Sequence, residues 1–439
     1  MEEIKEQNIK QKNVFTNRNF TLTFLGALVS NVAALFYSFA VSFYILKITD
    51  NNAFLQGLYL ALGGIVFCIV SLFGGVISDR FNKAKIMYIC DYLKGFIIIG
   101  FTLLLMFVIK TVNGQVIALF VVTVLLNGIA GVFSPASSAL LPQIVEEESF
   151  QQAQSYFSIL SSFQSIVGVI LAGVLYTLIP INILFIIVGV FYVLSAVSEM
   201  FIKYDSKYEK TDEKLTLKIF FSDIKDGFKY LFSMKPILAL MICVLFINFF
   251  FSPFFDNFIP YFISTDVASS NYIFSEKMAP EMWSSFFSVA IGLGSLIMGI
   301  VLSNAKQMEK CNKTIRWSTI AIAVVFALYS ILYALFISGI ININVILITY
   351  VVEFFLIGLL LVLVNVPSTT AMMKVVDKDK FGKVSSVANI GSQGLIPVSM
   401  LLGGLAITYL GPLGLTIICA SGFLLIALIL FFNKPIREL

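Results

Sequence analysis

Long apolar segments recur along the whole chain and limit what it can fold into. Twelve such segments can be marked, and each is long enough to cross about 30 Å of hydrocarbon. Only 12% of the 439 residues are charged and 59% are hydrophobic, whereas about 25% are charged in ordinary soluble domains. The sequence therefore predicts an all-α polytopic membrane protein. Its transmembrane helices are expected at about 20–46, 53–78, 85–109, 115–137, 151–178, 181–202, 236–263, 282–303, 315–338, 342–370, 383–409 and 412–432.

The distribution of positive charge predicts the orientation. Twelve spans put both termini on one side of the membrane, and 26 of the 29 Lys and Arg residues fall on that side when Lys94 is counted there. Only Lys47, Lys110 and Lys277 fall opposite. Because Lys and Arg favour the cytoplasmic side, we expect a multi-pass protein of a cell (plasma) membrane, of bacterial type, with both termini cytoplasmic. The first nineteen residues are polar and charged, without the apolar region or cleavage site of a signal peptide, so we expect that none is removed.

The missing residue types exclude several functions. The chain has no histidine, which removes His-based acid–base chemistry and the usual zinc ligands. Its five cysteines are scattered singly, without metal-ligand spacing. No nucleophile motif accompanies them. We therefore expect no enzyme activity, no metal site and no cofactor, and any proton chemistry has to use carboxylates.

The chain divides into two similar halves. Residues 203–235 form the longest polar stretch and contain an amphipathic pattern at 217–232 that is typical of a helix on the membrane surface. "SPASSALLPQIVEEESF" (134–150) aligns with "NVPSTTAMMKVVDKDKF" (365–381). The predicted domains are a six-helix bundle at 1–202, a cytoplasmic linker at 203–235 and a second bundle at 236–439. Two parallel six-helix repeats, related by pseudo-twofold symmetry, are an architecture of secondary transporters.

"GGVISDRFNKAK" (74–85) resembles the loop signature between helices 2 and 3 of the major facilitator superfamily. Gly75, Asp79, Arg80 and Lys83 match that signature, and Asn82 stands where the family usually has Gly. Since Asn tolerates left-handed backbone, we expect it to preserve the turn. The stretches "MYICDYLKG" (87–95), "FSPASSALLPQIVEEESFQQAQS" (133–155) and "DIKDGFKYLFSMKPIL" (223–238) resemble the macrolide-efflux-like, drug-exporter branch.

The resemblance implies a charged latch on the cytoplasmic side. Asp79 would face the N-terminus of helix 11, near Phe381, where the helix dipole favours a carboxylate. Arg80 and Asp91 would complete the network, together with Gly75 and Lys83. The alternative is a solvated, positively charged loop. In the second half Ser303 and Asn304 replace the Asp–Arg pair, so the latch is expected in one half only.

Acidic residues inside apolar spans are the candidates for proton coupling, because burying a charge in a membrane is costly. Glu353, in "TYVVEFFLIG", is the first candidate, and Asp256, between Pro253 and Pro260, is the second. The alternative for both is a position near the outer surface, or, for Glu353, a structural partner that holds it. Asp91 and Glu199 lie close to helix ends, where structural ion pairs are expected. Uncharged polar residues within spans are candidates for a substrate cavity or for helix–helix hydrogen bonds: Asn31, Asn127, Gln164, Asn248, Asn365, Asn389 and Gln393.

The sequence thus predicts a secondary transporter that exports a hydrophobic or amphiphilic compound, such as a macrolide-like drug, by alternating access and proton antiport. Its energy source would be the proton gradient. Its partners would be this small molecule and membrane lipid, without nucleic acid, and the chain would act as a monomer. One alternative keeps the fold but moves a lipid, a siderophore or a peptide-derived natural product. Another is a membrane sensor or immunity-type partner that transports nothing.

Overall fold

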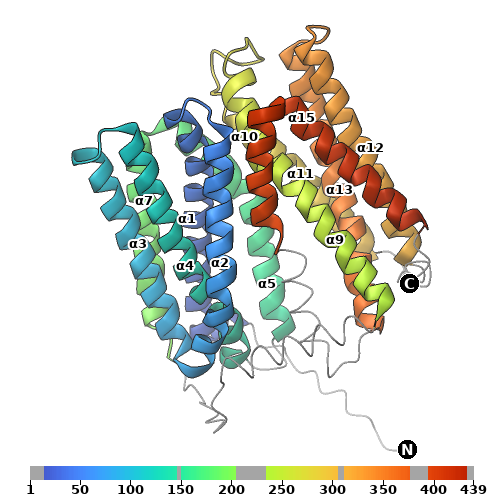
Figure 1. Cartoon of the computed structure of the whole chain (residues 1–439). Coiled ribbons are helices and arrows are strands. Elements are labelled where there is room, and N and C mark those ends of the chain that lie inside the picture. Colours follow the sequence, from blue (N-terminus) through green and yellow to red (C-terminus); the bar gives the residue numbers. More distant parts are fainter. Residues whose placement is uncertain (1–13, 146–149, 204–233, 305–310, 376–393, 433–439) are drawn as a thin grey trace, which may run out of the picture.

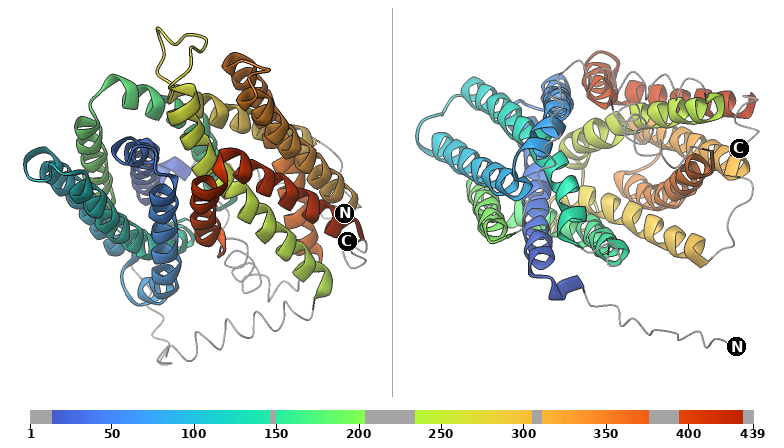
Figure 2. Two further views of the ribbon diagram at one scale, coloured as in Figure 1. Left: turned by 45° about the horizontal axis from the view of Figure 1, so that its top comes forward. Right: turned by 90° about the horizontal axis from the view of Figure 1, so that it is seen from below.

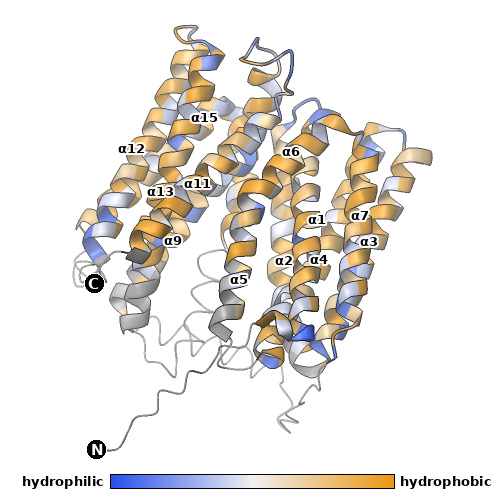
Figure 3. Ribbon diagram, turned by 180° about the vertical axis from the view of Figure 1, so that it is seen from behind, coloured by the Kyte–Doolittle hydropathy of each residue, from blue (hydrophilic) through white to orange (hydrophobic). Residues whose placement is uncertain are grey.

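The structure, a computed structural model, describes residues 14–145, 150–203, 234–304, 311–375 and 394–432. Within these ranges, eleven helices are long and apolar enough to cross a membrane. They form two bundles that stand side by side (Figures 1 and 2). Apolar residues dominate the length of the helices, and polar residues gather at their ends (Figure 3). This is the all-α, two-bundle membrane fold that the sequence predicts.

The first bundle follows the predicted spans closely. Polar side chains cap several of its helices, because the first N–H groups of a helix have no partner within the helix. Asn17, Asn52, Asn82 and Thr111 each accept a hydrogen bond from a backbone N–H of the first turn. The elements are η1 (Val14–Thr16), α1 (Arg18–Ile48), α2 (Ala53–Arg80), α3 (Lys83–Phe107), α4 (Val112–Ile144), α5 (Phe150–Phe163), η3 (Gln164–Gly168), α6 (Val169–Leu178) and α7 (Ile181–Met200).

The cap at Asn82 corrects one expectation. Its φ is −61° and its ψ is 115°, so the residue is extended and a left-handed backbone was the wrong reason for its presence. Instead, its side chain accepts a hydrogen bond of 3.1 Å from the Lys85 N–H. Asn82 therefore starts α3 at Lys83, two residues before the predicted start at 85.

This cap gives a first testable prediction. Asn82→Ala should lower the free energy of unfolding by about 1 kcal/mol, whereas Asn82→Gly should cost only a few tenths. Denaturant titration of the purified protein, followed by circular dichroism, would measure both changes. Equal losses in the two variants would contradict a capping role.

In the second bundle, the described parts of the last two predicted spans lie in one helix, α15. α15 runs through residue 411, where Gly411 has φ 76° and ψ 168°. Glycine accepts this left-handed backbone without strain, and the bend separates the predicted spans 383–409 and 412–432. The elements are α9 (Lys235–Pro253), η4 (Phe254–Phe258), α10 (Ile259–Phe262), η5 (Ile263–Val267), α11 (Met282–Asn304), α12 (Cys311–Ile337), α13 (Ile343–Val375) and α15 (Ile396–Phe432).

The two bundles have different interiors. The second has one continuous core in which aromatic rings pack on one another, as Phe254 does on Phe326 with ring centroids 4.9 Å apart. The first has two separate cores. One surrounds Phe185 and Ile98, and the other surrounds Phe20 and Met87. A layer of polar residues lies between them.

The bundles touch at the end of the molecule that carries the loops 49–52 and 268–281, which we name the upper end (Figure 1). There α2 packs against α15 through glycines: a Cβ on Gly57 would lie 2.9 Å from the Gly404 Cα. Glycine lets the backbones of two helices approach this closely in a membrane. A second contact is the hydrogen bond of 2.9 Å that Ser285 of α11 donates to the Val169 carbonyl at the start of α6.

The linker predicted at 203–235 lies almost entirely outside the described residues. Its amphipathic helix, and with it the domain boundaries, stay predictions.

Candidate functional site: a central cavity

A cavity of about 760 Å³ lies between the two bundles. Most of its wall comes from α1, α2 and α4 of the first bundle, while η4, α10 and α11 of the second bundle close the other side. Small-molecule sites commonly enclose about 300–1,000 Å³. The space is therefore large enough for a small molecule, and it lies below the contact at the upper end.

Serines and aromatic rings dominate the wall of the cavity. Ser30 and Ser38 lie on α1, and Ser134, Ser137 and Ser138 lie on α4 at a spacing that puts them on one helix face. Aromatic lining residues include Tyr37, Phe39, Phe43, Tyr59 and Phe67. Among the lining residues that the structure describes, the charged ones are Lys94 and Asp256. The cavity thus offers large apolar surfaces, scattered hydroxyl groups and one charge of each sign.

Asp256 lies on the wide helical turn η4, and Pro260, one of the two prolines predicted to disturb the helix, explains its setting. Pro260 has no N–H group, so the carbonyl of Asp256, four residues earlier, loses its usual helical partner. Gln56 of α2 fills this role by donating a hydrogen bond of 3.2 Å from its Nε2 to that carbonyl. The backbone of Asp256 therefore connects the two bundles while the residue lines the cavity.

Glu353 lies elsewhere. It is 6% exposed and belongs to α13, inside the second bundle. Its Oε2 has no hydrogen-bond partner among the described residues, and the same holds for the nearby Tyr329 hydroxyl. Glu353 is absent from the described lining of the cavity. The structure therefore does not bring the two predicted coupling acids together in one site.

The latch residues are described only in part. Gly75, Asp79 and Arg80 belong to the last turns of α2, but their side chains lie outside the described residues, and so does Phe381. Lys83 begins α3 and is buried. Asp91 lies two turns further along α3, where it is fully buried and pairs with Lys94. The latch stays a prediction.

The polar candidates for the cavity fall into three groups. Asn31 and Asn127 line it. Gln164, on η3, Asn248, on α9, and Asn365, on α13, do not appear in its described lining. Asn389 and Gln393 lie outside the described residues. The structure therefore places Asn31 and Asn127 at the cavity, and a role of any of the seven residues in substrate binding stays a prediction.

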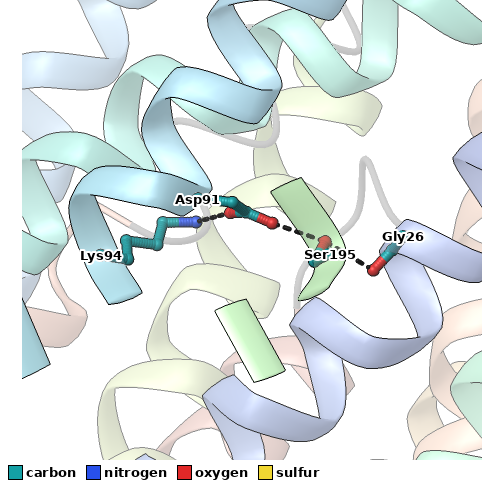
Figure 4. A network of polar contacts seen from close by, with 4 residues as sticks. All are labelled: Gly26, Asp91, Lys94 and Ser195. Carbon is teal, nitrogen blue, oxygen red and sulfur yellow. Dashed lines mark hydrogen bonds and ion pairs between the residues drawn. The ribbon is translucent and has the colours of Figure 1, made fainter. Parts of the chain in front are cut away.

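Lys94 is the lining residue that sequence reasoning misplaced. It was counted with the cytoplasmic charges, but it is 6% exposed and lies within the first bundle, against the cavity. Its Nζ is 3.0 Å from the Asp91 Oδ1 (Figure 4). The spacing of three residues between an acid and a base on one helix is the signal that could have revealed this pair. Glu199 needs the opposite correction, because the ion pair expected for it is absent among the described residues.

A second cavity, also of about 760 Å³, lies beside the first. It runs between α5–η3 and α11 and shares Leu35, Val169, Phe255 and Ser288 with the central cavity. Most of its other lining residues are apolar, and two of them, Leu296 and Ile300, are 41% and 55% exposed at its edge. This side cavity therefore lies next to the central cavity and extends to exposed apolar residues at the outer surface of the bundles.

Comparison with known families matches residues 23–399 to the Major Facilitator Superfamily. Two similar curated proteins come from Bacillus subtilis (strain 168). The uncharacterized MFS-type transporter YkuC is 24% identical over 298 residues, which cover 66% of this chain and 65% of that protein. YfiS, also an uncharacterized MFS-type transporter, is 22% identical over 364 residues, which cover 83% of this chain and 81% of that protein. The match to YkuC thus covers a little under two thirds of that relative.

Solved structures share the fold at low identity. A bacterial homologue of the iron transporter ferroportin, in an inward-facing state, superposes with a TM-score of 0.70 at 14% identity and covers 93% of this chain and 98% of its own. A D-xylose–proton symporter gives 0.70 at 12% identity, covering 96% and 98%. A POT family transporter in complex with 5-aminolevulinic acid gives 0.72 at 13% identity, covering 95% and 96%.

Proposed function

Because the chain belongs to the major facilitator superfamily, we propose that it moves a hydrophobic or amphiphilic small molecule out of the cell through the central cavity. Inward proton movement would drive this export. The protein would reside in the cell membrane with its termini in the cytoplasm, since the Lys and Arg residues concentrate on that side. The upper end would then face outward.

The composition of the cavity wall is the observation that carries the proposal. Its aromatic and aliphatic side chains offer apolar contact area, and its serines offer hydroxyl groups that bind polar parts of a molecule weakly. With a single described cation and a single described anion, the wall suits a cargo that is mostly apolar.

The side cavity supports the same class of cargo. A molecule dissolved in the bilayer could enter between α5 and α11 and reach the central cavity without crossing water, since the two cavities share part of their walls. This route favours amphiphiles that partition into the membrane. It also supports the second candidate function, the export of a lipid, because a lipid chain could stay in the side cavity while its head group lies in the central one.

Protons would couple to transport through Asp256 and Glu353. An isolated acid within a membrane span costs about 2.5–3.5 kcal/mol at the helix centre. Such a cost favours a function for each of the two acids. Asp256 lies at the cavity, where its charge can respond to cargo. Glu353 has an unpaired buried oxygen, which suits a carboxyl group that holds a proton during part of the cycle.

The experiment is an efflux assay in cells and in reconstituted vesicles, with a panel of dyes, macrolides and fluorescent lipids. We expect outward movement of at least one amphiphile that stops when a protonophore collapses the gradient. Asp256→Asn and Glu353→Gln should each remove the dependence on the gradient. Asp266→Asn is the matched control, because Asp266 lies outside the described lining and accepts a hydrogen bond of 2.8 Å from Tyr333.

The outcomes separate the alternatives. Efflux that ignores both the protonophore and the two substitutions would refute proton antiport while keeping export. Movement of the fluorescent lipid alone would favour the second candidate. A folded protein that moves no compound and no protons would refute transport and favour a sensor or partner role.

A further inference from the structure

A polar layer crosses the first bundle between its two hydrophobic cores. It contains Asp91 and Lys94 on α3 and Ser195 and Glu199 on α7, packed against Gly26 of α1 (Figure 4 shows all but Glu199). Asp91 and Glu199 are 0% exposed. Burying two acids and a base inside a bundle is costly, and neither the cavity wall nor the predicted latch explains Glu199.

Glu199 forms no ion pair with any residue that the structure describes. Both of its carboxyl oxygens are buried without a hydrogen-bond partner among the described residues. The side chain occupies space that Gly26 leaves open, since a Cβ there would lie 2.9 Å from the Glu199 Cγ and 3.1 Å from its Oε1. An ionised carboxylate without donors is penalised strongly in such a place. The arrangement therefore suits a carboxyl group that holds a proton.

Ser195 indicates a second place for a proton. Its Oγ lies 2.9 Å from the Gly26 carbonyl oxygen and 2.7 Å from the Asp91 Oδ2. Its hydroxyl has one proton, and a carbonyl oxygen can only accept. If Asp91 is ionised, the Ser195 hydroxyl can donate its one proton to Asp91, and the Gly26 carbonyl then receives no hydrogen bond from it. If Asp91 carries a proton, Asp91 donates to Ser195 and Ser195 donates to the Gly26 carbonyl. The two patterns differ by one proton.

The charges of the layer leave room for such a proton. With both acids ionised, Asp91, Glu199 and Lys94 sum to one negative charge, and one bound proton makes the layer neutral. Among the described residues, the other titratable groups that face it are Cys90 on α3 and Tyr192 on α7. α1 contributes Gly26, which is uncharged.

Lys94 connects this layer to the cavity. Its ammonium group pairs with Asp91 on one side, and on the other it lies 4.0 Å from the ring centroid of Phe133 and 5.2 Å from that of Tyr192. Both rings line the central cavity, as Lys94 itself does. Water or cargo in the cavity can therefore reach Lys94, and a change at Lys94 alters the surroundings of Asp91 directly.

We propose that Asp91, Lys94 and Glu199 form a proton-binding site in the first bundle, separate from Asp256 and Glu353, which exchanges its proton with the central cavity through Lys94. An anionic group of a cargo that attracts Lys94 would weaken its pairing with Asp91, and Asp91 would then retain the proton. The protonation of this site, inside the first bundle, would thus depend on whether the cavity is occupied. The proposal does not depend on the direction of transport.

Infrared spectroscopy of the purified full-length protein in lipid nanodiscs tests this site without any cargo. Protonated carboxyl groups give a separate absorption band, which we would follow through a pH titration. We expect Glu199→Gln to remove one carboxyl contribution from this band. Glu276→Gln is the matched control, because Glu276 is exposed and its substitution should leave the contributions of the buried carboxyl groups in place. A folded Glu199→Gln protein with an unchanged band would overturn the proposal.

Ser195→Ala provides an independent measurement, because it changes no charge and decides the matter if Glu199→Gln does not fold. Removal of the hydroxyl should shift the position of the carboxyl band, since a protonated Asp91 would lose the hydroxyl that accepts its hydrogen bond. A spectrum identical to that of the unaltered protein at every pH would count against the site. Neither measurement depends on the efflux assay, so the proposed export and this site can fail separately.

Discussion

Gly57→Ala is expected to slow transport strongly and to open the upper end of the molecule. A Cβ at residue 57 would lie 2.6 Å from the Met400 carbonyl oxygen and 2.9 Å from the Gly404 Cα. Both atoms belong to the backbone of α15, so relief requires the two bundles to separate. Overpacking of this kind costs about 1–3 kcal/mol. A change of that size shifts an equilibrium between two arrangements by about 5- to 150-fold.

Cysteine labelling can measure this shift. We would place a cysteine at Ser42, which lines the cavity, in a background without the five native cysteines, and apply a membrane-impermeant maleimide from the side that the upper end faces. Labelling should increase in the Gly57→Ala variant. Gly100→Ala is the matched control, since a Cβ on Gly100 would meet no atom within 4 Å. Unchanged labelling together with unchanged transport would show that this contact does not control the upper end.

Breaking the pair between Asp91 and Lys94 is expected to give the largest loss of stability. Removing one partner of a buried ion pair typically costs about 3–5 kcal/mol, because the other charge stays buried alone. Lys94→Met should lower the free energy of unfolding by that amount, and Asp91→Asn should also destabilise. The double variant should recover most of the loss, since replacing both charges is often close to neutral.

Denaturant titrations of the three variants in detergent would complete this double-mutant cycle. Lys110→Met serves as the surface control, because Lys110 is exposed beside the upper end and surface substitutions usually change stability by less than about 0.5 kcal/mol. Simple additivity of the two single losses would contradict a direct pairing. The cycle concerns stability alone, whereas the infrared titration concerns the proton.

Most of the fold could be predicted from the sequence, because a bilayer requires long apolar helices and leaves few alternatives. The predicted spans differ from the helices mainly at their ends. α4 reaches Ile144 and α13 reaches Val375, beyond the predicted ends at 137 and 370, since a helix can continue past the edge of its apolar segment into polar residues. The bend at Gly411 was also marked correctly by the boundary between two spans.

The candidate site was less predictable, because hydropathy does not say which face of a helix a polar residue occupies. Asn31 and Asn127 lie at the cavity, and Gln164 does not appear in its described lining. The surroundings of Lys94 and Glu199 result from the packing of α1, α3 and α7 on one another, and the sequence of a single helix does not reveal this packing. The serines of α4 do carry a readable signal, since residues three and four apart share a helix face.

The hydrogen bond from Gln56 to the carbonyl of Asp256 has a mechanical consequence. Any motion that separates α2 from η4 must break this hydrogen bond, which contributes about 0.5–1.5 kcal/mol. The carbonyl of Asp256 then needs water as its new hydrogen-bond donor. Asp256 also contributes to the wall of the cavity. The main chain of Asp256 would therefore hold the two bundles together, while its side chain lies at the cavity. A change in the charge of Asp256 and the separation of the two bundles would then involve the same residue.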